Sequence, residues 1–321
     1  MTGAPDVDYT ATSLRPQWHT LPATLREALA VALGTEISSV TAPVTSGFTG
    51  GFAAAARLAD GRRVFIKAAD DSMHAHQAYQ REAEVVPQLP SSIKIPAIVT
   101  TVHDRNWFAL VSEWVDGQMP GDPWTDADFE VVTAACEGIA EVMRPSPLAG
   151  LERFGDLVGD DVQVPAQLIA GERPMPIGLQ PWLPRVLPDL AELVTLAPEA
   201  LAGDSAVHSD LRPDNLLIDR AGTCWTLDWN WLTLGPRWVD WVGLLPAAQH
   251  QGIDTAAAIR SSPLTADVPP DHLDCLVAVI AAYMMKNTEA PPPRGCTPAL
   301  REHQRFYAWT FLDWLAARRG W

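Results

Sequence analysis

Two short segments of the sequence carry the residue types that phosphoryl transfer requires. Residues 207–218 read VHSDLRPDNLLI, and residues 227–229 read LDW. A transferred phosphoryl group needs positioning, metal ions and a site for an acceptor hydroxyl, but little covalent chemistry from the protein. Asp210 can accept the proton of an attacking hydroxyl, while Asn215 and Asp228 offer oxygen atoms of the kind that bind Mg²⁺. The order and spacing of these three residues predict a kinase-type site.

A tight hairpin is expected to bring the two metal ligands together. Residues 215–219 and 224–229 are strand-like runs, and an Arg-Ala-Gly turn separates them. Asn215 begins the first run and Asp228 lies near the end of the second. The hairpin would fold both ligands back toward one point.

The rest of the chain divides into a strand-rich part and a helical part. Periodicity predicts the following elements in the first part: a helix at 21–33, strands at 37–46, 52–58 and 63–69, a helix at 72–89, and strands at 97–102 and 107–112. This order predicts a five-stranded antiparallel sheet with one helix inserted after its third strand. Thr125 is expected to cap a helix at 126–143, and mostly helical sequence follows, interrupted by a proline-rich segment at 145–184.

Composition bounds the class of protein. The chain has 321 residues, 47% of them hydrophobic, which is enough for a real core and for two domains or lobes. Lys and Arg together number 23 and Asp and Glu 39, so the formal net charge is −16. Because nucleic acids and anionic membrane surfaces repel such a protein, we expect neither as a partner. The composition leaves the oligomeric state open.

Two further features concern the compartment. The longest apolar run, Cys275–Met285, is shorter than the roughly 20 residues that cross a bilayer, so it is predicted to be a buried helix. The N-terminus shows no secretory signal. The four cysteines form no CxxC pair, which favours a reducing cytoplasm over a disulfide framework or a zinc site.

The ordered motifs resemble those of the aminoglycoside phosphotransferase family, which shares the protein-kinase-like fold. The resemblance extends over about residues 40–315. It implies an α+β bilobal architecture, with a small antiparallel β-sheet lobe and a larger, mainly α-helical lobe. The implied parts are an N-terminal helical extension at 1–35, a nucleotide-binding lobe at 36–114, and a catalytic and acceptor-binding lobe at 115–321.

The resemblance assigns roles around the first motif. HSDLRPDN corresponds to the family's catalytic loop and LDW to its metal-binding motif. Asp210 would then be the catalytic base, with Asn215 and Asp228 as the magnesium ligands. His208 would support the loop, and Asp240 in GPRWVDW would brace it. Taken alone, Asp210 would more often be an ordinary turn residue.

The small lobe would hold the nucleotide. Lys67 stands where the family places the lysine that binds the phosphates, and Glu82 would be its ion-pair partner. Glu84 is the alternative partner, but it lies about 200° around the same helix, so only one of the two can face the lysine.

A glycine-rich loop lies between the first two predicted strands. It reads SGFTGGF over residues 46–52, where the family has its phosphate-covering loop. The residues expected to approach phosphate oxygens through their backbone are Gly47, Gly50 and Gly51. A tight hairpin without a ligand is the ordinary alternative.

The base of the nucleotide would sit at the junction of the lobes. Glu113 and Val115 match the family's hinge, which pairs an adenine edge through its backbone. Leu217 and Leu227 would form an apolar floor under the base. Because backbone pairing does not separate the two purines, the donor is either ATP or GTP.

The acceptor pocket is expected between the segment 145–184 and the C-terminal helices. Trp229 and Trp231 are candidates for stacking on the acceptor, although core packing is the commoner fate of tryptophan. The acidic group Glu152, Asp156, Asp160 and Asp161 could attract a polycation or could simply be solvated surface.

The resemblance implies a small-molecule kinase. We expect the acceptor to be a hydroxyl of an antibiotic such as an aminoglycoside or a nucleoside. The alternative is a metabolic kinase for choline, homoserine or a sugar. A protein kinase is disfavoured because no Ala-Pro-Glu segment follows Asp228. A non-catalytic binding module is disfavoured because all the chemical residues are present together.

Overall fold

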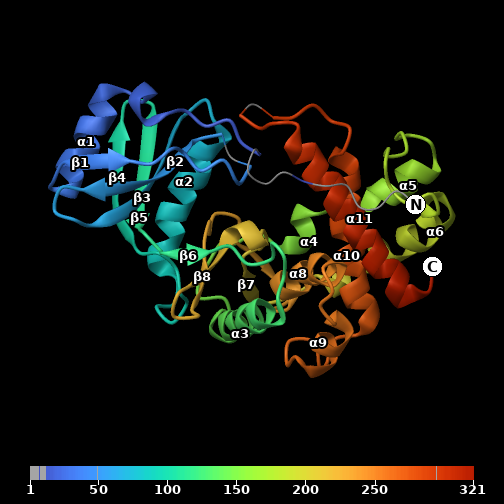
Figure 1. The fold of residues 1–321 in the computed structure, drawn as a ribbon. Helices are drawn as coiled ribbons and strands as arrows, with labels where there is room; N and C mark the ends of the chain where they lie inside the picture. Colours follow the sequence, from blue (N-terminus) through green and yellow to red (C-terminus); the bar gives the residue numbers. More distant parts are fainter. Residues whose placement is uncertain (1–6, 8–11, 49, 294) are drawn as a thin grey trace.

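The computed structural model describes residues 7, 12–48, 50–293 and 295–321. Figure 1 shows a small, strand-rich lobe beside a larger helical lobe, with the chain passing from one to the other after β5. The α+β bilobal fold expected from the sequence is confirmed.

The small lobe is built on one antiparallel sheet. Its strands are β1 (Ile37–Val40), β2 (Phe52–Leu58), β3 (Arg63–Asp70), β4 (Ile98–Asp104) and β5 (Trp107–Glu113), in the order β1-β2-β3-β5-β4. The predicted five-stranded sheet is therefore confirmed. β1 is shorter than the predicted strand at 37–46, because Pro43 has no N–H to give to a ladder.

The N-terminal helix belongs to the core of this lobe. Helix α1 (Ala23–Leu33) buries Leu25, Leu29 and Leu33, which recur every four residues and so share one face. They pack in one cluster with Phe52 and Ile66 of the sheet. The predicted extension is thus held to the sheet by apolar contact.

Helix α2 (His74–Val85) follows β3 and packs against β3 and β5. It is shorter than the predicted helix at 72–89. The chain continues into a 3₁₀ turn, Val86–Gln88, because Pro87 cannot donate the next helical hydrogen bond.

The large lobe is mainly helical. Its helices are α3 (Asp126–Val142), α4 (Phe154–Leu157), α5 (Val164–Ile169), α6 (Leu183–Leu193), α7 (Ala197–Ala200), α8 (Val239–His250), α9 (Thr255–Ser261), α10 (Pro270–Asn287) and α11 (Ala299–Arg319). Thr125 caps α3 as expected, accepting a hydrogen bond from the Asp128 amide at 3.1 Å. The predicted buried helix at 275–285 lies within α10 and packs against α11 and α8.

Helices α4 and α5 lie inside the proline-rich segment, which is therefore less irregular than its sequence suggested. The shorter 3₁₀ turns are Trp18–Thr20, Asp161–Gln163, Val194–Leu196 and Pro213–Asn215. Within the described ranges, no helix combines the length and the hydropathy needed to cross a membrane.

Short strands position the motifs of the large lobe. They are β6 (Gly117–Gln118), β7 (Ser205–Val207), β8 (Leu216–Asp219), β9 (Cys224–Thr226) and β10 (Thr233–Gly235). Strands β8 and β9 form the predicted hairpin. β9 ends earlier than expected, because Asp228 turns into the left-handed region, with φ 60°.

Two segments that are far apart in the sequence, one before α1 and one before α11, lie side by side. Ser13 pairs with Cys296 in an antiparallel bridge, and the Leu14 amide donates to the Gly295 carbonyl at 3.0 Å. The segment before α1 therefore lies beside the segment that leads into α11.

Candidate active site

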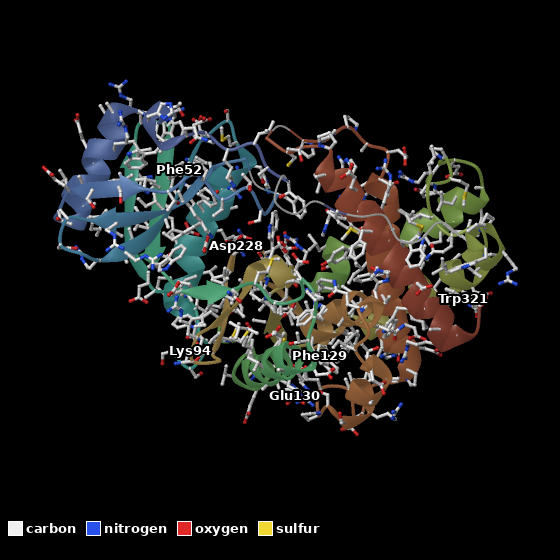
Figure 2. The ribbon with its side chains drawn as sticks, viewed as in Figure 1. Phe52, Lys94, Phe129, Glu130, Asp228 and Trp321 are labelled. Atoms are coloured by element: carbon white, nitrogen blue, oxygen red, sulfur yellow. The ribbon has the colours of Figure 1, made fainter. Side chains whose placement is uncertain are left out.

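A cleft of about 400 Å³ lies between the lobes. Figure 2 shows Asp228 between the sheet of the small lobe and the helices of the large one. The predicted site residues that line the cleft are Gly47, Lys67, Glu82, Glu113, Val115, Asp210, Asn215, Leu217, Leu227, Asp228 and Trp231. The fold thus gathers residues from six separate parts of the sequence, between 47 and 231, around one space.

An ion cluster centred on Lys67 joins the two lobes. Lys67 lies on β3, and its Nζ is 2.6 Å and 2.9 Å from the two carboxylate oxygens of Glu82 on α2. The same Nζ contacts Oδ1 of Asp228 in the large lobe. Glu84 is exposed, so Glu82 is the partner, as the family resemblance implied, and only one of the two faces the lysine, as the helical phase predicted.

Burial and opposite charges act against each other in this cluster. Burial alone would lower the pKa of Lys67, but Asp228 and Glu82 raise it above its ordinary value. Burial raises the pKa of Glu82, and Lys67 only partly offsets this effect. Burial would also raise the pKa of Asp228, yet Lys67 holds it below the ordinary value. Of the two carboxylates, Asp228 is therefore the more acidic.

A second ion cluster centres on Arg212 in the catalytic loop. Its guanidinium contacts Oδ1 of Asp210 and binds Asp214 through two hydrogen bonds of 3.0 Å and 3.1 Å. Burial raises the pKa of Asp210, and Arg212 opposes that rise without cancelling it. Burial would raise the pKa of Asp214 too, but Arg212 holds it below its usual value. Of the two carboxylates, Asp210 is the more basic.

The backbone at the site is strained. Ser209 and Asp228 both have positive φ, 68° and 60°, which costs an L-residue roughly 1–2 kcal/mol. Asp240 stabilises this conformation, because its carboxylate accepts the backbone N–H groups of His208 and Ser209 at 2.7 Å and 2.8 Å. The contact is the bracing that the sequence led us to expect.

His208 is buried behind the loop rather than facing the cleft. Its Nε2 donates to the Leu227 carbonyl at 2.8 Å, which ties the catalytic loop to the segment before Asp228. This contact fits a supporting role and leaves no position for the ring as a base at the cleft.

Asn215 and Asp228 present suitable ligand atoms for magnesium. The Asn215 amide nitrogen donates to the Asp210 carbonyl at 2.7 Å, which leaves its amide oxygen for a cation. Asp228 is ionised, and a carboxylate with an amide oxygen is a hard donor set of the kind Mg²⁺ takes. Among the described residues, no three His, Cys, Asp or Glu side chains form a metal cluster. The donor set therefore fits an ion that also binds phosphates and water.

The glycines of the loop at 46–52 serve different purposes. Gly47 has φ 81° and lines the cleft. A Cβ at Gly50 would come within 2.8 Å of the Gly295 Cα, and a Cβ at Gly51 within 2.8 Å of the Tyr79 hydroxyl. The expectation of phosphate contact is therefore supported for Gly47, whereas close packing explains Gly50 and Gly51.

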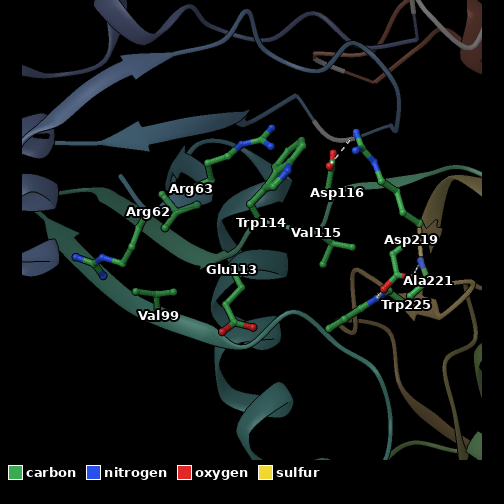
Figure 3. A pocket seen from close by; sticks show the side chains of 12 residues that line it. Arg62, Arg63, Val99, Glu113, Trp114, Val115, Asp116, Asp219, Ala221 and Trp225 are labelled. Carbon is green, nitrogen blue, oxygen red and sulfur yellow. Dashed lines mark hydrogen bonds and ion pairs between the residues drawn. The ribbon is translucent and has the colours of Figure 1, made fainter. Parts of the chain in front are cut away.

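At the hinge, the amide of Glu113 donates to the Ala97 carbonyl at 2.9 Å and is thus occupied within the sheet. Any pairing with a base must use other backbone groups of the hinge. A second hollow, of about 650 Å³, shares Glu113, Trp114 and Val115 with the cleft. One ion pair beside this hollow joins Asp116 to Arg220 at 3.3 Å, and a dashed line in Figure 3 marks this interaction at Asp116.

The two candidate tryptophans have different surroundings. Trp229 is 1% exposed and donates to the Thr226 hydroxyl at 3.0 Å, so the expectation that it stacks on the acceptor is wrong. Trp231 is 42% exposed, lines the cleft and stacks on His74 of α2, with 5.4 Å between ring centroids. Of these two tryptophans, Trp231 is the one that can reach a ligand in the cleft.

The acidic group at 152–161 is not one surface. Asp161 is buried and its Oδ1 is 2.8 Å from Lys286 Nζ, so its charge is neutralised within the protein. Glu152, Asp156 and Asp160 are exposed. The expectation that all four attract a cation is therefore wrong for Asp161.

Several cleft residues were missed in the sequence. Arg212 lies two residues from Asp210 and from Asp214, and an arginine between two acids was a usable signal. Phe48 and Arg15 also line the cleft. The Phe48 ring lies 5.3 Å from the Arg212 guanidinium. No local pattern marks Arg15, which reaches the cleft only through the fold.

Comparison with known proteins places this architecture. Residues 45–264 match the profile of the phosphotransferase enzyme family (APH). No curated protein sequence gives a match. Many solved structures resemble the chain, and those that share less than a quarter of its sequence identify the fold alone.

Three of these structures illustrate the likeness. An aminoglycoside phosphotransferase from Alicyclobacillus acidocaldarius is 16% identical, with a TM-score of 0.55 over 95% of this chain and 97% of that one. A thermostable mutant of aminoglycoside phosphotransferase APH(4)-Ia, in complex with AMP-PNP and hygromycin B, is 13% identical, with a TM-score of 0.62 over 92% and 98%. Choline kinase LicA from Streptococcus pneumoniae is 15% identical, with a TM-score of 0.59 over 92% and 98%.

Proposed function

This chain belongs to the phosphotransferase enzyme family, and we propose that it transfers the γ-phosphoryl group of ATP, with Mg²⁺, to a hydroxyl group of a small molecule. One observation carries the proposal. Lys67, Asp210, Asn215 and Asp228 line a single cleft, where they would serve as a phosphate-binding cation, a base and two metal ligands.

Each of these residues has a step. Asp210, whose pKa is raised by burial, accepts the proton of the acceptor hydroxyl. The hydroxyl oxygen forms a bond to the γ-phosphorus as the bond from that phosphorus to the β–γ bridging oxygen breaks, and ADP leaves. Lys67 binds phosphate oxygens, and Glu82 directs its ammonium group.

Asn215 and Asp228 would hold Mg²⁺, which when bound offsets the negative charge of the phosphates. The contact between Lys67 and Asp228 keeps that carboxylate ionised and facing the cleft. Asp228 would therefore contact Lys67 and also serve as a ligand of the metal.

ATP is the proposed donor. A related structure contains AMP-PNP and another ADP, whereas nothing comparable supports GTP. Glu113 and Val115 would contact the base through their backbone, over Leu217 and Leu227. All four cysteines are free thiols, which suits the reducing cytoplasm, where ATP is supplied.

We further propose an antibiotic or a similar polar metabolite as the acceptor. The acidic side chains that line the cleft outnumber the cationic ones, Arg15, Lys67 and Arg212, five to three. This balance favours a neutral or cationic acceptor, and Trp231 offers an exposed ring to stack on it. Relatives are described with hygromycin B and with spectinomycin.

A metabolic acceptor is the second candidate. Structures of a choline kinase and of a putative fructosamine kinase resemble the chain as well as those of the antibiotic kinases do. The buried pair of Asp161 and Lys286 removes one of the charges that favoured a polycation. Choline carries one positive charge, whereas an aminoglycoside carries several.

A mass-spectrometric screen tests both acceptor classes. Wild type and Asp210→Asn are incubated with Mg²⁺ and ATP or GTP against aminoglycosides, nucleoside antibiotics, choline, homoserine and sugars. The proposal predicts a product heavier by one phosphate that forms with wild type and not with the variant. Equal product formation by Asp210→Asn would refute the role of Asp210.

A further inference from the structure

The glycine loop at 46–51 is held from outside by a short N-terminal segment, residues 12–15. The amides of Thr12 and Ser13 both donate to the Thr45 carbonyl at 3.1 Å. The Thr12 hydroxyl lies 3.0 Å and 2.7 Å from the carbonyl oxygens of Thr45 and Gly47. The Ser13 hydroxyl also contacts the Gly47 carbonyl.

Arg15 bridges the two ends of this loop. One guanidinium nitrogen is 3.0 Å from the Ser46 carbonyl, and the other is 2.7 Å from the Gly51 carbonyl. Arg15 also lines the cleft. A forked donor can span two carbonyls at once, whereas the point charge of a lysine cannot.

These contacts decide which backbone groups of the loop can meet a ligand. A carbonyl oxygen that faced the cleft would repel phosphate, whereas backbone N–H groups attract it. The segment 12–15 binds the carbonyls of residues 45, 46, 47 and 51. These four carbonyl oxygens already accept hydrogen bonds within the protein, so they are not free to turn toward a phosphate group.

The segment is itself anchored to the large lobe. The Thr297 amide donates to the Thr12 carbonyl at 3.2 Å, and the Leu14 amide to the Gly295 carbonyl at 3.0 Å. Gly50 packs against Gly295 so closely that a Cβ would not fit. Residues 12–15 and the segment at Gly295 and Thr297 thus hold the loop from two directions in the sequence, and both segments lie outside the family match at 45–264.

We propose that Arg15, with Thr12 and Ser13, is a positioning element that holds the glycine loop in the conformation that binds the nucleotide triphosphate. Its guanidinium also adds a positive charge to the wall of the cleft beside the phosphates. This proposal rests on the proposed function, because it concerns the same nucleotide site. It adds residues that the family match does not include.

Isothermal titration calorimetry can distinguish binding of the triphosphate from binding of the nucleoside, because the two ligands are titrated separately. Mg–AMP-PNP and adenosine are titrated into wild type, Arg15→Ala, Arg15→Lys and the control Arg81→Ala, an exposed arginine of α2. Because a charge-assisted hydrogen bond contributes about 1.5–3 kcal/mol, we expect both Arg15 variants to bind Mg–AMP-PNP at least ~10-fold more weakly. Adenosine binding and the control should match wild type.

Three outcomes would overturn the proposal. Unchanged Mg–AMP-PNP affinity in Arg15→Ala would show that the bridge is not needed. An equal loss for adenosine would show a general structural defect. Full affinity in Arg15→Lys would show that charge alone suffices. If Arg15→Ala does not fold, Thr12→Val is the substitute, because it removes the hydroxyl near Thr45 and Gly47 while keeping the side-chain shape.

The same titration distinguishes a failure of the proposed phosphotransferase function from a failure of the positioning role of Arg15. Wild type that binds neither ligand would refute the proposed function and this proposal with it. Wild type that binds Mg–AMP-PNP, together with Arg15 variants that bind it equally well, would refute the positioning role alone.

Discussion

The Lys67 and Arg212 clusters have the same composition, one cation between two carboxylates, but they are built differently. Lys67 reaches Glu82 and Asp228 across 15 and 161 residues of sequence. Arg212 reaches Asp210 and Asp214 across only two residues in either direction. The first cluster therefore depends on how the lobes meet, whereas the second is a local property of one loop.

Both clusters divide their two carboxylates in the same way. The Glu82 and Asp214 side chains are 10% and 9% exposed, while those of Asp228 and Asp210 are 40% and 34% exposed. In each cluster one acid is a buried partner that fixes the cation. The other is the more exposed of the two acids that line the cleft, and to it we assign the chemistry.

The largest predicted effect tests this division within the Arg212 cluster. Asp210→Asn keeps the shape of the side chain but cannot accept a proton, so kcat should fall by on the order of 10²–10⁴. Asp214→Asn, the matched change of the buried acid, should reduce kcat far less. Steady-state kinetics measure kcat for the two variants. Similar kcat values for both would contradict the different roles assigned to Asp210 and Asp214.

The next effect concerns stability in the Lys67 cluster. Lys67→Met leaves Glu82 buried without its cation, which should lower the free energy of unfolding by about 3–5 kcal/mol. Urea denaturation measures the change. Lys67→Met with Glu82→Leu should recover much of it, because the buried carboxylate of Glu82 is then removed together with its cation, while Asp228 is 40% exposed to solvent. A loss below about 1 kcal/mol, the value of an exposed pair, would mean that the cluster is effectively solvated.

The contrast between the clusters also explains what sequence could predict. Helical phase separated Glu82 from Glu84, and residue spacing found Asp210, Asn215 and Asp228. These are local patterns, and so is the succession of strands along the chain in the small lobe. The ion pairs of Arg212 with Asp210 and Asp214 are equally local. They were not predicted, although the spacing of an arginine two residues from each acid permits them.

Residues that reach the site only through tertiary contacts could not be predicted from the sequence. Arg15 meets a loop more than 30 residues away, and Gly50 is required by Gly295. Nothing in the sequence distinguishes Trp229 from Trp231, because their burial depends on which way the segment after Asp228 turns. The strained φ of Asp228 decides that turn.

A smaller effect concerns the pH dependence of turnover. Arg212 opposes the rise in the pKa of Asp210 that burial causes, so its removal should raise that pKa further. Catalysis needs Asp210 ionised, and activity is lost as the pH falls through its pKa. The acidic limb of kcat/KM should therefore move to higher pH in Arg212→Gln and stay near that of wild type in Arg212→Lys. An acidic limb at the wild-type pH in Arg212→Gln would show that Arg212 does not control the pKa of Asp210.

A last prediction concerns His303, which is buried beside the Arg212 cluster. Burial, together with the charge of Arg212, lowers the pKa of His303 to about 3. Because the unfolded chain takes up the proton near pH 6.5, stability is fully present above that pH. It should decline toward pH 3 by at most ~1.4 kcal/mol per pH unit.

His303→Phe keeps a ring beside Phe48 and Tyr307 but cannot titrate. Urea unfolding between pH 6.5 and pH 4 should therefore show a shallower decline in the variant than in wild type. Parallel declines in the two proteins would place the acid sensitivity elsewhere.

The most direct test of the account is the affinity for Mg–AMP-PNP of wild type, Asp210→Asn and Lys67→Met, measured by calorimetry under conditions where all three are folded. If the Lys67 cluster binds the nucleotide and the Arg212 cluster serves turnover, Asp210→Asn should bind like wild type. Lys67→Met should bind at least ~10-fold more weakly. Wild-type affinity in Lys67→Met would contradict the assignment of the cleft.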